Sequence, residues 1–150
     1  MEWDLQKVKD LIKEKIEENL NLDYKASDSL QQNDKKANEI SKDVSAFANS
    51  DGGVIIYGIR EDNQNKHLPE SIDPINRSEI SKEWLEQIIQ SRIRPRIENI
   101  IIHPIPLEEE TNNLIYVVEI PQSNTAHQAS DRKYYKRYHY CPTKRFQLKR

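Results

Sequence analysis

All three glycines of this chain lie between Gly52 and Gly58, where a predicted helix gives way to a predicted strand. The sequence NSDGG (49–53) ends a helix expected over residues 37–49, and the β-branched run VIIYGI (54–59) is typical of a strand buried on both faces. Glycine permits a positive φ and lets a neighbouring backbone or ligand approach closely. The spacing alone also fits an ordinary helix–strand turn. Neither GxxxxGK(S/T) nor GxGxxG is present, and a helix C-terminus presents carbonyl groups, so we expect no phosphate loop here.

The rest of the pattern predicts helices and strands in mixed order. Amphipathic helices are expected over residues 4–20 and 82–92, the second capped by Ser81, because apolar residues recur there at helical spacing. Further strands are expected over 22–27, over 97–106 at an edge because of its prolines, over 114–120 at the centre, and over 133–140. Polar connections are expected over 27–36, 60–71 and 107–113, the last as a hairpin loop. This order predicts an α+β fold: a single domain over residues 1–150, with a mixed β-sheet flanked by about three helices.

Length and composition exclude several classes of protein. At 150 residues the chain is long enough for one domain with its own core. The single cysteine, Cys141, excludes an intramolecular disulfide framework and a cysteine-rich zinc site, and we expect it to be a small buried residue. No apolar run approaches the length of a membrane helix, and the N-terminus lacks the apolar region of a signal peptide. We therefore expect a soluble, cytoplasmic protein with no membrane partner.

Basic residues are concentrated at the C-terminal end of the chain. Eight of the 23 lysines and arginines, and none of the 25 acidic residues, lie in residues 132–150, although the net charge is −2. The cations alternate with aromatic residues in KYYKRY (133–138), a composition that suits a phosphate backbone and stacked bases. The same pattern fits a strand with an exposed basic face and inward-facing tyrosines. The candidate nucleic-acid contacts in this stretch are Lys133, Tyr135, Lys136 and Arg137.

A second group of cations surrounds Pro95. Arg92, Arg94 and Arg96 would either line a nucleic-acid groove or keep an edge strand soluble. The four histidines are scattered without metal-ligand spacing, and a lone histidine is more often a packed or surface residue. Of these, His127 lies in the turn before the basic stretch and is the candidate for a phosphate contact.

Four segments of the sequence together resemble a known family. NEISKDVSAFANSDGGVIIYGIRED (38–62) resembles the core motif of the Schlafen-type AlbA-like domain, a family with many members labelled as DNA-binding. The other matching segments, in the family's order, are LDYK (22–25), IIQSRIRPRI (88–97), and LIYVVEIPQSNTAHQ followed by KYYKRY (114–138). The resemblance covers roughly residues 16–140 and implies that family's fold.

The nuclease branch of this family uses three clustered acidic residues and a divalent metal, so the resemblance implies a metal site. Carried over by position, the acids are Glu18 at the end of the first helix, Asp23, and Glu61 with Asp62 as the alternative. Asp23 stands where the family usually has Glu, and Glu61 where the nuclease branch tends to have Asp. Such carboxylates would hold Mg²⁺ or Mn²⁺. Lys25, on the same strand face as Asp23, would hold the scissile phosphate or neutralise developing charge. Without the resemblance, the same acids would be read as a solvated surface.

Three functions remain open from the sequence. The first is a metal-dependent endoribonuclease that acts on structured RNA such as tRNA, bound along Arg92–Arg96 and Lys133–Arg150. Nuclease members embrace RNA with two copies of this fold in one chain, so this chain is expected to form a homodimer. The alternative is a non-catalytic DNA-binding module of a larger regulatory protein. The third is an interaction module whose basic end docks an acidic partner.

Overall fold

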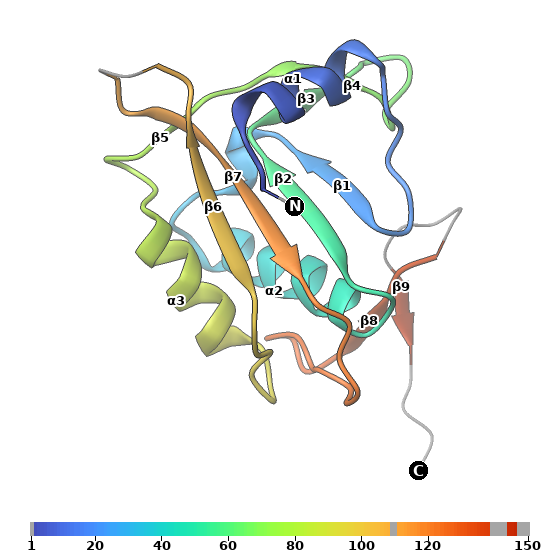
Figure 1. Ribbon diagram of the computed structural model, residues 1–150. Coiled ribbons are helices and arrows are strands. Elements are labelled where there is room, and N and C mark those ends of the chain that lie inside the picture. Colours follow the sequence, from blue (N-terminus) through green and yellow to red (C-terminus); the bar gives the residue numbers. More distant parts are fainter. Residues whose placement is uncertain (1, 109–110, 139–143, 147–150) are drawn as a thin grey trace.

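A mixed β-sheet of five strands lies at the centre of the computed structural model, which describes residues 2–108, 111–138 and 144–146 (Figure 1). Its strands are β1 (Leu22–Lys25), β2 (Gly53–Tyr57), β5 (Ile75–Asn76), β6 (Ile101–Pro106) and β7 (Asn113–Ile120). The order is β1-β2-β7-β5, with β6 also paired to β7, and only the β1–β2 pair is parallel. β7 therefore has neighbours on both sides, which confirms its central place. β6 pairs only with β7 among the described residues, as expected of an edge strand with two prolines.

Three helices and two small strand pairs complete the fold. The helices are α1 (Leu5–Lys13), α2 (Asp34–Ala48) and α3 (Lys82–Arg92), with a short 3₁₀ turn, η1 (Ser27–Ser29). The strand pairs are β3 (Ile59–Glu61) with β4 (Pro69–Ile72), and β8 (Tyr134–Lys136) with β9 (Lys144–Phe146). This arrangement confirms the predicted α+β class. Across the described residues, the structure has no helix with the length and hydrophobicity that a bilayer crossing requires.

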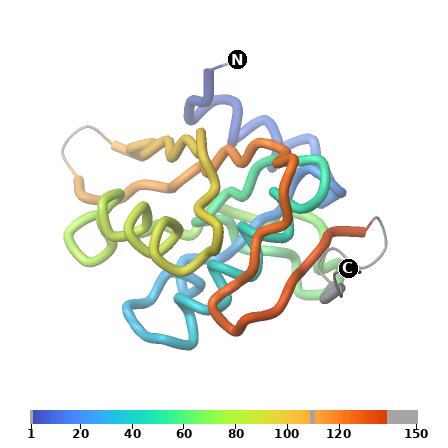
Figure 2. Tube along the Cα trace, turned by 90° about the horizontal axis from the view of Figure 1, so that it is seen from below, coloured from blue at the N-terminus to red at the C-terminus, as the bar shows by residue number. Residues whose placement is uncertain are grey.

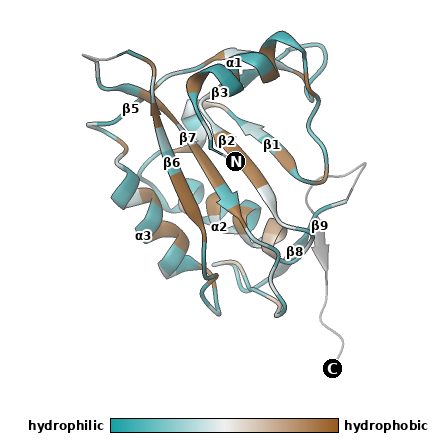
Figure 3. Cartoon of the chain, in the orientation of Figure 1, coloured by the Kyte–Doolittle hydropathy of each residue, from teal (hydrophilic) through white to brown (hydrophobic). Residues whose placement is uncertain are grey.

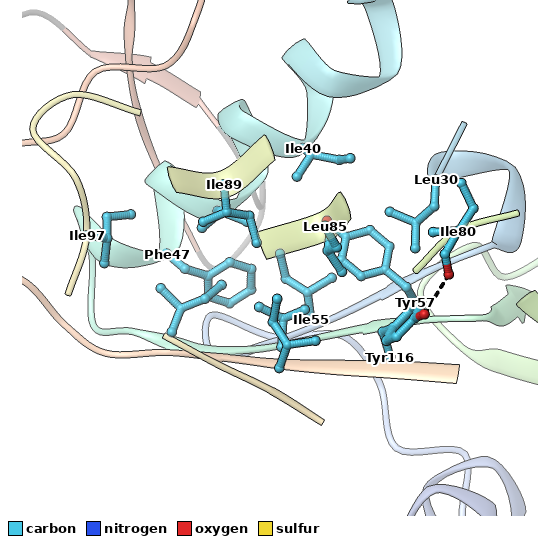
Figure 4. Close-up of a cluster of buried hydrophobic side chains, with 14 of the residues drawn as sticks. Leu30, Ile40, Phe47, Ile55, Tyr57, Ile80, Leu85, Ile89, Ile97 and Tyr116 are labelled. Carbon is cyan, nitrogen blue, oxygen red and sulfur yellow. Dashed lines mark hydrogen bonds between the residues drawn. The ribbon is translucent and has the colours of Figure 1, made fainter. Parts of the chain in front are cut away.

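The sheet has helices on both faces because β2 and β7 alternate apolar side chains between two cores. Ile55 and Tyr57 point to the face covered by α2 and α3, whereas Ile56 points to the face covered by α1. Figure 2 shows α1 on one side of the strands and the other two helices opposite. Figure 3 shows hydrophobic stretches along the central strands, and Figure 4 shows the larger core, in which Phe47 and Leu85 lie against the sheet.

Each helix begins at a side chain that accepts a hydrogen bond from the first turn. Asp4, Asn33 and Ser81 accept from the backbone N–H groups three residues later. The Ser81 cap confirms the predicted start of α3. Because Asn33 provides a cap, α2 begins at Asp34, within the segment that was expected to be a polar connection.

The first helix is shorter than its apolar pattern predicts. The expected helix over 4–20 ends at Lys13, because Lys15 adopts a left-handed backbone conformation with φ 51°. Lys15 N donates to Ile12 O and Ile16 N donates to Leu11 O, the two hydrogen bonds of a Schellman motif. Glu18 therefore lies in the segment that leads into β1 and not on a helix, which corrects its predicted place.

The glycine-rich stretch packs against the chain's own backbone. A Cβ atom on Gly52 (φ 73°) would lie 2.6 Å from Gln122 N, and one on Gly53 (φ 151°) would collide with Asn21 O. Gly58 (φ 110°) divides the expected strand over 54–59 into β2 and β3. Residues 60–71, predicted as a connection, continue β3 and form the β3–β4 hairpin. The predicted close approach at the glycines is confirmed, with backbone as the neighbour of Gly52 and Gly53 and the side chain of Ile115 as the nearest neighbour of Gly58.

Candidate metal centre and nucleic-acid interface

Three acidic side chains from separate segments meet at one place. Glu18 precedes β1, Asp23 lies in β1, and Glu61 ends β3. Each offers one carboxylate oxygen, and these three oxygens lie within 4.8 Å of one another. The side chains of Glu18 and Asp23 are nearly buried, with exposed fractions of 7% and 6%. We call these three residues the acidic cluster.

The backbone around β1 gathers these acids. β1 pairs in parallel with β2, and Gly58 N donates to Lys25 O at 2.7 Å, so β3 leaves β2 beside the end of β1. Glu18 is fixed from two sides: its backbone N–H donates to His67 O at 2.9 Å, and its Oε1 accepts from Tyr24 N at 3.2 Å. The strand pairing and these two hydrogen bonds place three separate carboxylates at one point.

Burial, together with the neighbouring carboxyl groups, shifts the protonation of Glu18. Burial raises the pKa of Glu18 from 4.5 to about 10, with further contributions from a hydrogen bond to Glu61 and from the charge of Asp23. Without another cation close by, this carboxyl group is therefore protonated at neutral pH. Carboxylate oxygens are the hard ligands that Mg²⁺ and Mn²⁺ prefer, so the donor set fits such an ion. Asp62, the alternative to Glu61, instead accepts from Gln64 N and Asn65 N in the hairpin turn.

Two basic side chains lie against Asp23. Lys25 Nζ is 3.5 Å from Asp23 Oδ2 and 3.7 Å from Asp43 Oδ2, as its place on the same strand face predicts. Arg137 Nη1 is also 3.5 Å from Asp23 Oδ2. Burial raises the pKa of Asp43 to about 6, although Lys25 opposes this shift.

Arg137 was expected on a nucleic-acid surface, and the structure buries it instead. Its side chain has an exposed fraction of 0%, and its guanidinium lies 3.9 Å from the centre of the Phe47 ring. Nε and Nη2 donate to the carbonyl oxygens of Leu20 and Asn19 at 3.0 and 2.8 Å. The position of Arg137 is therefore fixed by the segment between Glu18 and β1, and we correct its role to that of a partner of Asp23.

Two other predicted nucleic-acid contacts are also buried. His127 has an exposed fraction of 2%, and its ring nitrogens lie within hydrogen-bonding distance of Pro95 O and Ser123 Oγ. Both ring nitrogens are engaged with these partners, so neither is free to contact a phosphate. Tyr135 is buried and its hydroxyl donates to Asp131, so its ring is not presented to a base.

The remaining predicted cations lie near the surface. Arg94, Arg96, Lys133 and Lys136 are exposed, whereas Arg92 pairs with Asp34 at 3.0 Å. Gln128 bridges the two basic segments, because its backbone pairs with both Arg94 and Tyr134. Cys141, Lys149 and Arg150 lie outside the described residues, as do the side chains of Lys144 and Arg145.

Two residues of this site were not among the candidates from the sequence. Asp43 had a signal, because it lies on the same face of its helix as Ile40 and Phe47, where an acidic residue is unusual. His67 contacts Glu18 through both its carbonyl oxygen and its ring, with Nδ1 3.4 Å from Oε2. Nothing in the local sequence marks His67, because the contact depends on the β3–β4 hairpin.

Comparison with solved structures supports the architecture. The crystal structure of the DIP2311 protein from Corynebacterium diphtheriae is similar to this chain, with a TM-score of 0.55 and 16% sequence identity. The match covers 85% of this chain and 22% of that protein's chain, so this chain spans less than a quarter of its length. At this identity the likeness shows the fold alone. No curated protein matches the sequence.

A family model gives the more specific result. The model described as "Schlafen, AlbA_2" matches residues 18–140. This range runs from the first acid of the cluster through the glycine-rich turn to the basic stretch, and it confirms the resemblance seen in the sequence. The chain belongs to the Schlafen AlbA_2 family.

Proposed function

We propose that this domain binds structured RNA and cleaves its phosphodiester backbone with a divalent cation held by Glu18, Asp23 and Glu61. Membership in the Schlafen AlbA_2 family indicates nucleic-acid binding. The convergence of three carboxylate oxygens within 4.8 Å of one another is the observation that carries the catalytic part. It would be uncommon for a solvated surface set to include two acids as buried as Glu18 and Asp23.

The acidic cluster, Arg137 and Lys25 have different roles in the proposed reaction. When bound, Mg²⁺ or Mn²⁺ polarises a phosphoryl oxygen and lowers the pKa of an attacking water. The three carboxylates would hold the ion, and Arg137, 3.5 Å from Asp23 Oδ2, would neutralise part of the charge of Asp23 and orient it. Burial lowers the pKa of Lys25, but the carboxylates of Asp43 and Asp23 outweigh burial and raise it above its ordinary value. Lys25 therefore stays positively charged and would bind a phosphate oxygen electrostatically, without acting as a base.

The exposed cations near the Gln128 bridge form the proposed RNA surface. Arg94 and Lys133 belong to segments that Gln128 joins through backbone pairing, so cations far apart in sequence lie along one region. Such contacts to phosphate position the strand without reading its sequence. A tRNA is the substrate we expect, in the cytoplasm, with two copies of the chain forming the binding cleft as a homodimer.

The test is a cleavage assay with labelled tRNA, rRNA and duplex DNA, with Mn²⁺ or Mg²⁺ and with or without chelator. Cutting of RNA that stops with chelator is expected. Asp23→Asn and Glu61→Gln should abolish cutting and preserve binding, whereas Glu17→Gln, a change at an exposed acid next to Glu18, should cut normally. Binding by the wild type without cutting under any metal would support a non-catalytic module. Cutting that survives the chelator or either cluster variant would contradict the metal site.

A further inference from the structure

A small polar pocket lies beside the acidic cluster, on the side of the sheet that α2 covers. Its volume is about 210 Å³, and its walls come from β1, η1, the end of β2 and residues 35–43 of α2. Lys25 joins this pocket to the cluster, because it lines the pocket and also lies 3.5 Å from Asp23. A polynucleotide with a phosphate at the cluster therefore has its adjoining nucleotide near the pocket.

The strongest sign of a ligand is the hydroxyl group of Tyr57. This side chain lines the pocket and has an exposed fraction of 1%, yet the described residues offer its Oη no hydrogen-bond partner. Tyr116, on the neighbouring strand, donates its hydroxyl to Ile80 O at 2.6 Å (Figure 4). Burial of an unpaired hydroxyl is unfavourable, so such a group calls for a partner that the described residues do not supply.

The other lining groups indicate what that partner is. Asp43 contributes a carboxylate acceptor, held 3.7 Å from Lys25, and Ile40 contributes an apolar wall. A phosphate alone would be repelled by Asp43, whereas a sugar hydroxyl can donate to a carboxylate and accept from a tyrosine. A volume of about 210 Å³ accommodates a single sugar ring and not a whole nucleotide.

Cations at the rim match the phosphates that flank a sugar. Lys35 and Lys36 lie in the first turn of α2 and line the pocket, where the positive end of the helix dipole adds to their charge. Glu39 also lines the pocket, and its carboxylate lies 4.0 Å from Lys42. The pocket thus combines hydroxyl-binding groups inside with two lysines and one paired carboxylate in its more exposed part.

We propose that this pocket binds the ribose next to the phosphate at the acidic cluster, with Tyr57 and Asp43 hydrogen-bonded to its 2′-hydroxyl and Lys35 and Lys36 contacting the following phosphate. The inference rests on the proposed function, because the phosphate bound at the acidic cluster determines which ribose of the RNA lies at the pocket. Its consequence is discrimination at one nucleotide between ribose and a sugar that lacks the 2′-hydroxyl.

The test is fluorescence anisotropy with an RNA hairpin and its 2′-fluoro counterpart, which keeps the A-form helix and lacks the hydroxyl. Ca²⁺ replaces Mn²⁺ so that binding is measured without cutting. The wild type should bind the 2′-fluoro hairpin about tenfold more weakly, the loss expected for one hydrogen bond. Tyr57→Phe and Asp43→Asn should bring this ratio close to one, chiefly through weaker binding of the natural RNA. Tyr116→Phe, which removes a buried hydroxyl away from the pocket, should keep the wild-type ratio.

The outcomes separate this inference from the proposed function. A wild type that binds both hairpins equally, or a Tyr57→Phe variant that keeps the wild-type ratio, overturns the ribose site even if RNA is cleaved with Mn²⁺. Discrimination that depends on Tyr57, in a protein that never cleaves RNA, supports the ribose site and removes the catalytic proposal. Absence of binding to either hairpin overturns both.

Discussion

The acidic cluster gathers like charges in a nearly buried position, whereas the basic stretch over residues 132–138 divides its cations between solvent and the interior. Lys133 and Lys136 are exposed, but Arg137 is turned inward to Asp23. Alternation along the chain separates Lys136 from Tyr135 and Arg137, whose side chains point to the opposite face, and the hydrogen bonds to Leu20 O and Asn19 O hold Arg137 inside. The difference teaches that a local run of charge does not define a surface, and that Arg137 belongs physically to the acidic cluster.

The largest expected effect concerns Arg137. Arg137→Met would leave Asp23 without one of its basic partners and two backbone carbonyl groups without their donor, so the free energy of unfolding should fall by roughly 3–5 kcal/mol. Urea denaturation followed by circular dichroism measures this change. Lys133→Met, at an exposed position of the same stretch, is the matched control and should leave the stability nearly unchanged. Equal stability of the two variants would contradict the division of the basic stretch.

The next effect is the pH dependence of stability without metal. The pKa of Glu18 is raised from 4.5 to about 10 by folding, so the folded state favours the protonated carboxyl. The contribution of Glu18 is therefore fully present below about pH 4.5 and is lost as the pH rises toward 10. Thermal melts in chelator should show this loss, and Glu18→Gln should reduce it because a neutral amide does not titrate. If the melting temperature of the wild type changes no more between pH 4.5 and 10 than that of Glu18→Gln, the raised pKa of Glu18 is contradicted.

Two tyrosines provide a smaller and more specific comparison. Tyr116→Phe removes a buried hydrogen bond and should lower the free energy of unfolding by about 1 kcal/mol or somewhat more. Tyr57→Phe removes a hydroxyl that has no partner among the described residues, so it should be neutral or slightly stabilising in the absence of RNA. Denaturation of both variants in the same buffer measures the difference. A larger loss for Tyr57→Phe would show that its hydroxyl is already satisfied within the protein.

The smallest expected effect is a difference in RNA binding between a variant of the exposed Arg96 and a variant of the paired Arg92. Arg96→Met should weaken RNA binding a few-fold and reduce the slope of log affinity against log salt by about one. Arg92→Met should change the slope less, because Arg92 pairs with Asp34 at 3.0 Å. Filter binding across a salt series measures both slopes. If Arg92→Met has the larger effect, the proposed RNA surface lies nearer to α3 than we place it.

Much of the fold could be predicted because its signals are local. The β-branched runs of β2 and β7, the cap at Ser81 and the prolines of β6 each act through a few neighbouring residues. The end of α1 could not be predicted, since its left-handed position is occupied by Lys15, where glycine is the usual residue. β4 and the last two residues of β3 were missed because both strands are short and carry few apolar residues.

Most of the site could not be predicted from local sequence, because its residues meet through contacts between distant parts of the chain. The positions of Glu18, Asp23 and Glu61 came from family resemblance, and the local pattern alone did not distinguish them from surface acids. The inward turn of Arg137 depends on contacts with a segment 118 residues earlier in the chain. The position of Asp43 on an apolar helix face was a usable signal, because buried acids require a partner.

Anomalous diffraction from crystals soaked in Mn²⁺ tests the central claim most directly. The account predicts an anomalous peak bounded by the carboxylate oxygens of Glu18, Asp23 and Glu61, and its loss in crystals of Asp23→Asn. The absence of a peak at millimolar Mn²⁺, in crystals where no neighbouring molecule covers the cluster, would contradict it. A peak that persists in Asp23→Asn would contradict it as well.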